Sequence, residues 1–108
     1  MLKDIQQEVD KLINEINHVT STNEIYLFGS FAYGVPNEGS DIDLCIITND
    51  KNIRKIELVK SIRKSISKIA TMPIDILVYD RDEFNERAAL ESTIEHKIAI
   101  EGVSIYAQ

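Results

Sequence analysis

The sequence predicts an α/β domain in which helices pack on a small mixed β-sheet, and three observations lead to this fold class. Apolar residues recur at helical spacing in two long segments. Short runs rich in β-branched and aromatic residues lie between and after these segments. The two kinds of segment alternate along the chain in the order α-β-α-β-α-β-α-α-β, which is typical of a layered domain.

The first part of the chain is expected to contain two helices and two strands. Apolar residues at steps of three and four predict an amphipathic helix over residues 3–19. Residues 24–28 favour a short strand that stops at Gly29. Ser30 is expected to cap the short helix that follows. After a loop with two glycines and a proline, residues 41–48 are expected to form the second strand.

The middle of the chain is expected to add a long helix, a third strand and the start of another helix. Asn49 or Asp50 can cap the long helix. Its predicted apolar face consists of residues at helical spacing: Ile53, Ile56, Val59, Ile62, Ile66 and Ile69. Residues 74–79 favour a strand, and Asp80 with Glu83 can cap the helix after it.

The last part of the chain is predicted to hold one more helix and one more strand. Ser92 and Glu95 have the spacing of a capping box, so a helix should begin there and end before Gly102. Residues 104–107 favour a final strand. A chain of 108 residues is the length of one domain, so we expect a single domain over residues 1–108.

Composition and charge limit the classes of function. Twelve Lys and Arg against 18 Asp and Glu give a formal net charge of -6, which disfavours direct binding to nucleic acid. The same charge suits a site that gathers metal cations, or a basic protein partner. No segment is long and apolar enough to span a membrane, and residues 1–4 lack the apolar stretch of a signal peptide. Cys45 is the single cysteine, so a reducing, cytoplasmic location is expected.

Gly29 and Ser30 are the first candidate element of a functional site. They follow a strand directly and precede a possible helix start. Glycine lets backbone N–H groups approach a ligand closely, and a helix start favours an anion such as phosphate. The same dipeptide is common in ordinary turns, so it indicates a phosphate site only together with other residues.

Three aspartates are the second candidate element. Asp41 and Asp43 are two apart in a predicted strand, so their carboxylates should lie on one face. Two such charges repel unless a cation joins them, and Mg²⁺ prefers carboxylate and phosphate oxygens. Asp75 joins them if its strand neighbours the second strand in register. Taken singly, the first pair can also be a solvated strand end, and Asp75 can face water on an edge strand.

Together, these pieces resemble the minimal nucleotidyltransferases of the DNA polymerase beta superfamily. That family's pattern is an apolar residue with Gly-Ser, then Asp-apolar-Asp-apolar, then apolar-Asp-apolar. The matching pieces are Phe28-Gly29-Ser30, Asp41-Ile42-Asp43-Leu44 and Ile74-Asp75-Ile76. The stretches LFGSFAYGVPNEGSDIDL (27–44) and EGVSIY (101–106) extend the resemblance along the chain. It implies a polymerase-beta-like nucleotidyltransferase fold.

The resemblance also implies an activity, which is metal-dependent transfer of a nucleotide with ATP as the substrate and two Mg²⁺ ions. By position, Asp41 and Asp43 would bind both ions. Asp75 would complete the second metal site or act as the base on the acceptor hydroxyl. The residues that would hold the triphosphate are Gly29, Ser30 and Ser40.

The resemblance finally implies a partner. Stand-alone members of this kind are often the antitoxin of a pair whose toxin is a helical HEPN-domain ribonuclease. The implied reaction is transfer of AMP to a tyrosine of that toxin, and a homo- or hetero-oligomer is expected. Two alternatives stay open: transfer to a small molecule such as an aminoglycoside-type antibiotic, and neutralisation by binding alone.

Tyr33 departs from the pattern, because many members carry an arginine at this position. Arginine can bond phosphate through two N–H groups, whereas tyrosine can donate one hydrogen bond or stack on a base. Phosphate binding would then need another cation. The candidates at the start of the predicted long helix are Lys51, Arg54 and Lys55.

Overall fold

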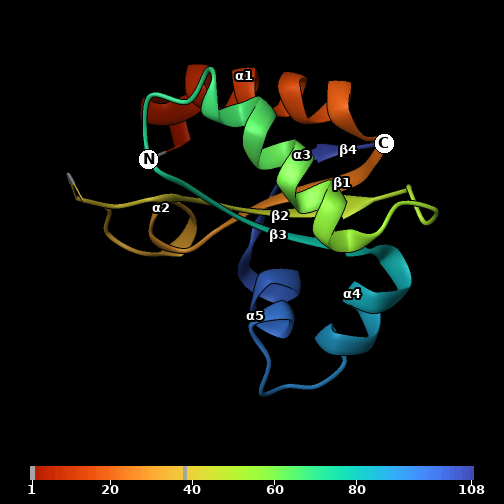
Figure 1. Ribbon diagram of the computed structural model, residues 1–108. Coiled ribbons are helices and arrows are strands. Elements are labelled where there is room, and N and C mark those ends of the chain that lie inside the picture. The colour runs from red at the N-terminus through yellow and green to blue at the C-terminus, as the bar shows by residue number, and fades with distance from the viewer. Residues whose placement is uncertain (1, 38) are drawn as a thin grey trace.

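The computed structural model describes residues 2–37 and 39–108, with side chains from Ile5 onward, and places helices on both faces of a four-stranded sheet (Figure 1). The helices are α1 (Leu2–Val19), α2 (Ser30–Tyr33), α3 (Lys55–Ser67), α4 (Arg81–Ala88) and α5 (Ile94–Glu101). The strands are β1 (Thr22–Phe28), β2 (Ile42–Thr48), β3 (Ile74–Asp80) and β4 (Val103–Ala107). The predicted fold class and order of elements are confirmed.

The sheet is mixed, with strand order β3-β2-β1-β4. Strand β1 pairs antiparallel with both β2 and β4, whereas β2 and β3 are parallel. A parallel pair needs a crossover connection, and α3 supplies it between β2 and β3. Strand β2 therefore lies inside the sheet with a hydrogen-bonded neighbour on each side.

Each face of the sheet has its own apolar core. Helices α1 and α3 lie on one face, where Ile42, Leu44 and Ile46 of β2 are fully buried. Helices α4 and α5 lie on the other face, where Cys45 and Ile47 are fully buried. Figure 1 shows the first pair of helices above the sheet and the second pair below it. Because both faces of β2 are covered beyond Asp43, residues 44–47 form a continuous apolar run rather than an alternating pattern.

Cys45 lies in the core, as its apolar neighbours in the sequence predict. Its side chain is fully buried, and burial raises the pKa of the thiol to about 12. A thiol that stays protonated is a poor nucleophile and a poor metal ligand, so Cys45 contributes packing rather than chemistry. Among the described residues, no helix is long and apolar enough to cross a membrane.

The start of α3 differs from the prediction. The helix begins at Lys55 and not after Asn49 or Asp50. The Asp50 carboxylate instead accepts hydrogen bonds from the Thr20 hydroxyl and, at 3.3 Å, from the Ser21 N–H. These bonds tie the end of β2 to the turn before β1, so the Asp50 side chain is used in a tertiary contact and the helix starts later.

The later start also changes the apolar face of α3. Ile53 lies before the helix, and both Ile53 and Ile56 are exposed. Of the predicted positions, Ile62 and Ile66 are buried as expected, while Leu58 takes the buried place of the first turn. The residues at the C-terminal end of the helix therefore fit the predicted helical spacing better than those at its beginning.

The N-terminal cap of α4 is the residue that the sequence predicts, and that of α5 differs from the prediction by one residue. The Asp80 carboxylate accepts from the Glu83 N–H at 2.8 Å, which confirms the cap of α4. Helix α5 is capped by Thr93, whose hydroxyl accepts from the His96 N–H at 3.1 Å, so the predicted cap at Ser92 is wrong by one residue. Sequence patterns seldom fix helix ends more closely than this.

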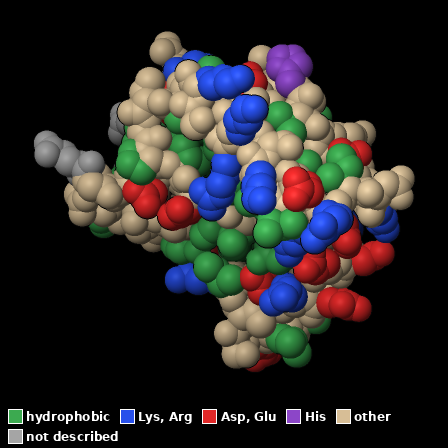
Figure 2. Space-filling view, viewed as in Figure 1, with side chains coloured by type: hydrophobic (Ala, Val, Ile, Leu, Met, Phe, Trp, Pro, Cys, Tyr) green, Lys and Arg blue, Asp and Glu red, His purple; other side chains and the backbone are tan. Residues whose placement is uncertain are grey.

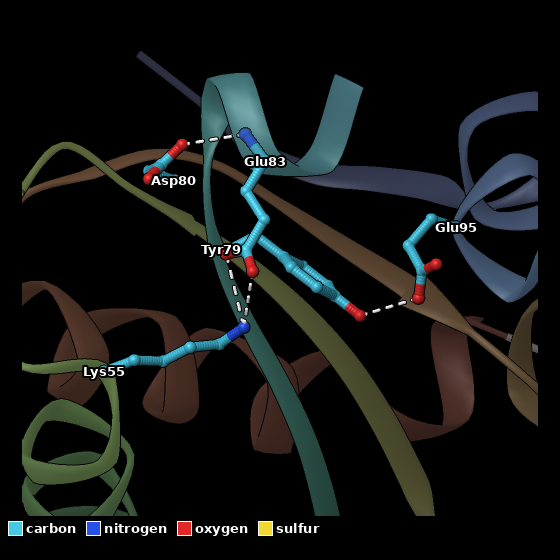
Figure 3. Close-up of polar contacts among 5 residues, drawn as sticks. All are labelled: Lys55, Tyr79, Asp80, Glu83 and Glu95. Carbon is cyan, nitrogen blue, oxygen red and sulfur yellow. Dashed lines mark hydrogen bonds and ion pairs between the residues drawn. The ribbon is translucent and has the colours of Figure 1, made fainter. Parts of the chain in front are cut away.

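A buried polar pair anchors α5 to the sheet. The Tyr79 hydroxyl donates to the Glu95 carboxylate over 2.7 Å, and Glu95 is only 4% exposed (Figure 3). Burial, followed by this bond to Glu95, raises the pKa of Tyr79 well above its ordinary range, so the hydroxyl remains a donor at neutral pH.

Replacing Tyr79 with phenylalanine is expected to lower the free energy of unfolding by about 1–3 kcal/mol, because Glu95 is then buried without this donor. Urea denaturation followed by circular dichroism measures the change. Tyr106→Phe, at a half-buried tyrosine of β4, is the matched control and should cost less than half as much. Equal losses in the two variants would contradict the importance of the buried pair.

Candidate active site

The registers of the sheet bring two of the predicted aspartates together. Asp43 of β2 pairs with Asp75 of β3, and Phe28 of β1 pairs with Asp43. Paired residues of neighbouring strands project to the same face, so these three side chains form one row across three strands. The condition that the sequence left open for Asp75, a neighbouring strand in register, is met.

The two aspartates of this row, Asp43 and Asp75, are called the acidic row below. They lie at the edge of the face that α4 and α5 cover. Further along the strands the same face carries Cys45, Ile47 and Tyr79, which pack against Phe84 and Ile98 of the two helices. Burial ends where the acidic row begins, since Asp43 is half-buried and Asp75 is exposed. The apolar core thus fixes the strands, and the carboxylates stand at its open border.

Gly29 follows β1 and lies directly against this row. Its φ of +75° and ψ of -153° are backbone angles that residues with a side chain rarely adopt. A Cβ at Gly29 would lie 3.0 Å from Asp43 Cγ and well inside van der Waals contact of Oδ2. Only glycine allows the backbone to approach the carboxylate this closely. The Gly29 carbonyl then accepts from the Ala32 and Tyr33 N–H groups, both at 3.0 Å, and so starts α2.

The serines of the predicted site are placed differently from one another. Ser30 is the first residue of α2 and half-buried, and Gly29 rather than Ser30 is the cap, so the predicted cap is wrong by one residue. Ser40 immediately precedes Asp41, and its hydroxyl accepts from the Asn37 N–H at 2.9 Å. Ser40 therefore helps to close the loop that delivers Asp41 to the start of β2.

The three carboxylates act on one another electrostatically. Burial, followed by the charges of Asp75 and then Asp41, raises the pKa of Asp43 above its ordinary value. In the described residues the ion pairs involve other groups, as the five pairs show: Lys11–Glu8, Lys51–Asp82, Lys55–Glu83, Arg81–Glu24 and Lys97–Glu101. The acidic row thus carries unneutralised charge, which is the electrostatic condition for binding a cation.

The carboxylates of this site suit a Mg²⁺ ion that binds together with a nucleotide. Within residues 5–37 and 39–108, whose side chains the structure describes, no three acidic, imidazole or thiol groups converge closely enough to enclose an ion by themselves. Mg²⁺ is usually held by one or two carboxylates together with phosphate oxygens and waters, rather than in a closed protein cage. Partly exposed carboxylates beside a glycine turn therefore suit a nucleotide-bound Mg²⁺ ion better than a structural metal site.

Lys51, Arg54 and Lys55 do not lie at this site. They follow the C-terminal end of β2, and about 17 Å of extended strand separates Asp43 from Thr48. Lys55 Nζ lies 3.0 Å from Glu83 and 4.6 Å from the centre of the Tyr79 ring (Figure 3). These candidates for a phosphate-binding cation are therefore wrong in position. Figure 2 shows Lys and Arg side chains gathered over α3, on the face of the sheet opposite α4 and α5.

One cation near the site was missed by the sequence analysis. Lys97 of α5 holds its Nζ 4.6 Å from the centre of the Tyr33 ring in α2. The two residues are far apart in the sequence, and the contact arises because α5 packs beneath β1 through Ile98. No spacing in the sequence signals such a contact.

Comparisons with known proteins identify the family and the fold. The family model described as a nucleotidyltransferase domain matches residues 8–100. A crystal structure from Sulfolobus solfataricus, described as a nucleotidyltransferase, superposes with a TM-score of 0.62 at 19% identity and covers 97% of this chain and 82% of that one. By sequence, no curated protein matches the chain significantly.

Two toxin–antitoxin structures are also similar. One, solved with AMP-PNP, gives a TM-score of 0.53 at 20% identity over 91% of this chain and 73% of that one. The other is a variant of the MntA–HpeT pair, with a TM-score of 0.52 at 17% identity over 94% and 73%. At these identities the likeness concerns the fold, and the expected polymerase-beta-like nucleotidyltransferase fold is confirmed.

Proposed function

The chain belongs to the family of nucleotidyltransferase domains, and on this premise we propose that it transfers AMP from ATP to a tyrosine hydroxyl of a HEPN-type toxin and thereby acts as its antitoxin. The observation that carries the proposal is the row of Asp43 and Asp75 beside Gly29. A strand register that sets two carboxylates side by side without a protein cation costs stability, and metal-dependent transfer is a use that explains it.

Asp41, Asp43 and Asp75 have distinct roles in this proposal. Asp41 and Asp43 would hold two Mg²⁺ ions, which when bound neutralise the triphosphate and acidify the acceptor hydroxyl. Asp75 is the exposed member, so it is the carboxylate that an incoming acceptor reaches first. It would complete the second metal site or accept the hydroxyl proton.

The phosphate-binding residues would act mainly by position. The backbone at Gly29 has no side chain to keep a polyphosphate away, and Ser30 adds a hydroxyl next to it. Ser40 would assist from the loop before Asp41. In the reaction the tyrosine oxygen forms a bond to the α-phosphorus, the bond to pyrophosphate breaks, and the hydroxyl proton leaves with the base. The protein's contribution is alignment and electrostatics.

A partner protein would complete the site. Asp75 lies on an open surface rather than in an enclosed cavity, so the acceptor must supply part of the wall. Two structures of similar fold are toxin–antitoxin assemblies, which supports a toxin as that partner. The net charge of -6 suits a toxin with the basic surface of an RNA-binding protein. With a single, buried cysteine, we place the reaction in the cytoplasm.

Incubation of the chain with α-³²P-labelled ATP, Mg²⁺ and the toxin encoded beside it tests the proposal. Label should appear on a toxin tyrosine, and Asp75→Asn should reduce labelling about a hundredfold or more. Asp82→Asn is the matched control, because this exposed aspartate lies in the first turn of α4, after the far end of β3, and pairs with Lys51. It should label the toxin as the wild type does.

Other outcomes separate the alternatives. Label on an added aminoglycoside and not on the toxin would assign a small-molecule acceptor. Neutralisation of the toxin without any label, unchanged in Asp75→Asn, would assign an antitoxin that works by binding alone. Either result would overturn transfer to the toxin.

A further inference from the structure

A cation from the C-terminal helix reaches the region where the family's arginine is replaced by tyrosine. Lys97 Nζ lies 4.6 Å from the centre of the Tyr33 ring, within the range of a cation–π contact. Tyr33 is 37% exposed, so the pair stands at the surface and not in the core. The geometry therefore places the positive charge of Lys97 over the uncharged ring of Tyr33.

This pair is close to the candidate phosphate-binding turn. Tyr33 is one helical turn after Ser30, and its N–H donates to the Gly29 carbonyl at 3.0 Å. Residues three apart on a helix have Cβ atoms about 5–6 Å apart. Gly29 in turn lies against Asp43. An ammonium group over Tyr33 is thus near the place where a triphosphate held at Gly29 and by the acidic row would extend.

Helix α5 holds the backbone of Lys97 firmly. The neighbouring Ile98 is fully buried beneath β1, and the helix is fixed at its start by the Thr93 cap and by the bond from Tyr79 to Glu95. Figure 1 shows α5 below the sheet, on the α2 side of α4. The long side chain can move while its point of attachment stays in place.

Lys97 is only weakly engaged within the protein. Its ion pair with Glu101 measures 3.9 Å, at the outer limit of such contacts, and both side chains are more than half exposed. Exposed pairs of this kind contribute little to stability. The shorter pairs of Lys55 and Arg81, at 3.0 Å and 2.8 Å, hold those cations more closely. Lys97 can therefore turn to a stronger anion at little cost.

We propose that Lys97 binds the triphosphate of the nucleotide, with the Tyr33 ring as its platform, and that this pair replaces the single arginine of the family pattern. The inference rests on the proposed function, because it names the residue that would neutralise the substrate of that reaction. It also accounts for a site whose own turn, residues 29–34, contains no cation. A phosphate group would bind the ammonium through charge-assisted hydrogen bonds.

Titration calorimetry with a non-hydrolysable ATP analogue and Mg²⁺ tests the assignment. Lys97→Gln should weaken binding of the analogue about tenfold, as loss of one charged hydrogen bond predicts. AMP lacks the outer phosphates, so its affinity should change less than twofold. Lys51→Gln is the matched control, since this exposed lysine lies at the other end of β2. It should leave both affinities unchanged.

Two further variants test the replacement directly. Tyr33→Arg in the Lys97→Gln background should restore most of the lost affinity for the analogue, because it returns the arginine of the family pattern. Glu101→Gln removes the carboxylate that competes for Lys97 and should tighten binding about twofold. Circular dichroism confirms that each variant is folded. If Tyr33→Arg failed to restore binding in the Lys97→Gln background, the proposal that Lys97 replaces the arginine of the family pattern would be overturned.

The outcomes distinguish this inference from the proposed function. A wild-type chain that binds no nucleotide in Mg²⁺ would contradict both. A wild type that binds the analogue, with Lys97→Gln equally tight, would overturn the role of Lys97 and leave the transfer reaction standing.

Discussion

Replacing Asp43 with asparagine is expected to lower kcat/KM for nucleotidyl transfer about a thousandfold or more. The side chain keeps its shape but loses the charge that would hold the metal ions, and interactions of this kind supply several kcal/mol of transition-state stabilisation. Steady-state rates of transfer to the proposed toxin acceptor measure the loss. Asp82→Asn, far from the row, should keep the wild-type rate.

The same substitution should not destabilise the metal-free protein. The raised pKa of Asp43 means that the folded chain binds more protons than the unfolded chain at pH values just above the ordinary value of 3.8. Stability of the wild type therefore falls as the pH rises through this window. Asp43→Asn lacks the titration, so its Tm at pH 7 should equal or exceed that of the wild type.

Added Mg²⁺ provides the complementary measurement. Together with a non-hydrolysable nucleotide it should raise the Tm of the wild type, because ligands that bind only the folded state stabilise it. It should not raise the Tm of Asp43→Asn. A variant that retains both transfer and the Mg²⁺ effect would show that Asp43 is not a metal ligand.

Replacing Gly29 with alanine is the second change with a large expected effect. The backbone angles at this position are strained for any residue with a Cβ, at a cost of about 1–3 kcal/mol. The new methyl group would also push into the Asp43 carboxylate. We expect a lower free energy of unfolding in urea and a loss of nucleotide binding of about a hundredfold or more, since relief of the clash displaces either the turn or the carboxylate.

Gly39→Ala is the matched control for this experiment. A Cβ there meets its nearest neighbour, Asn37 Oδ1, at 3.5 Å, which is an ordinary contact. The substitution should leave stability and nucleotide affinity close to those of the wild type. If alanine were tolerated at both glycines alike, the close approach of Gly29 to Asp43 would have no functional meaning.

The sequence predicts most of the fold because its local signals agree with the tertiary structure. Helical spacing identifies α1, and short runs rich in β-branched and aromatic residues identify β1, β2 and β3. The start of α3 is missed because Asp50 bonds to the turn at Thr20 and Ser21 instead of capping a helix. A side chain can serve either purpose, and only the packed structure decides between them.

The candidate site likewise combines residues that the sequence predicts with residues that only the structure reveals. The spacing of Asp41 and Asp43 is visible in the sequence, but Asp41 lies just before β2 rather than in it, so the predicted strand over residues 41–48 is wrong at its first residue. The placement of Asp75 depends on strand order and register, which the sequence leaves open. Lys97 was missed altogether, since its approach to Tyr33 depends on how α5 packs on the sheet. Residues joined by local geometry are thus predictable, whereas those joined only by packing are not.

The parallel pairing of β2 with β3 also determines when the protein becomes active. Asp75 reaches Asp43 only after the intervening helix has crossed over the sheet, and distant pairings of this kind form slowly during folding. A nascent chain that has not yet released β3 from the ribosome lacks one of the three acidic groups. Enzymatic competence should therefore emerge only after β3 has left the ribosome and paired with β2.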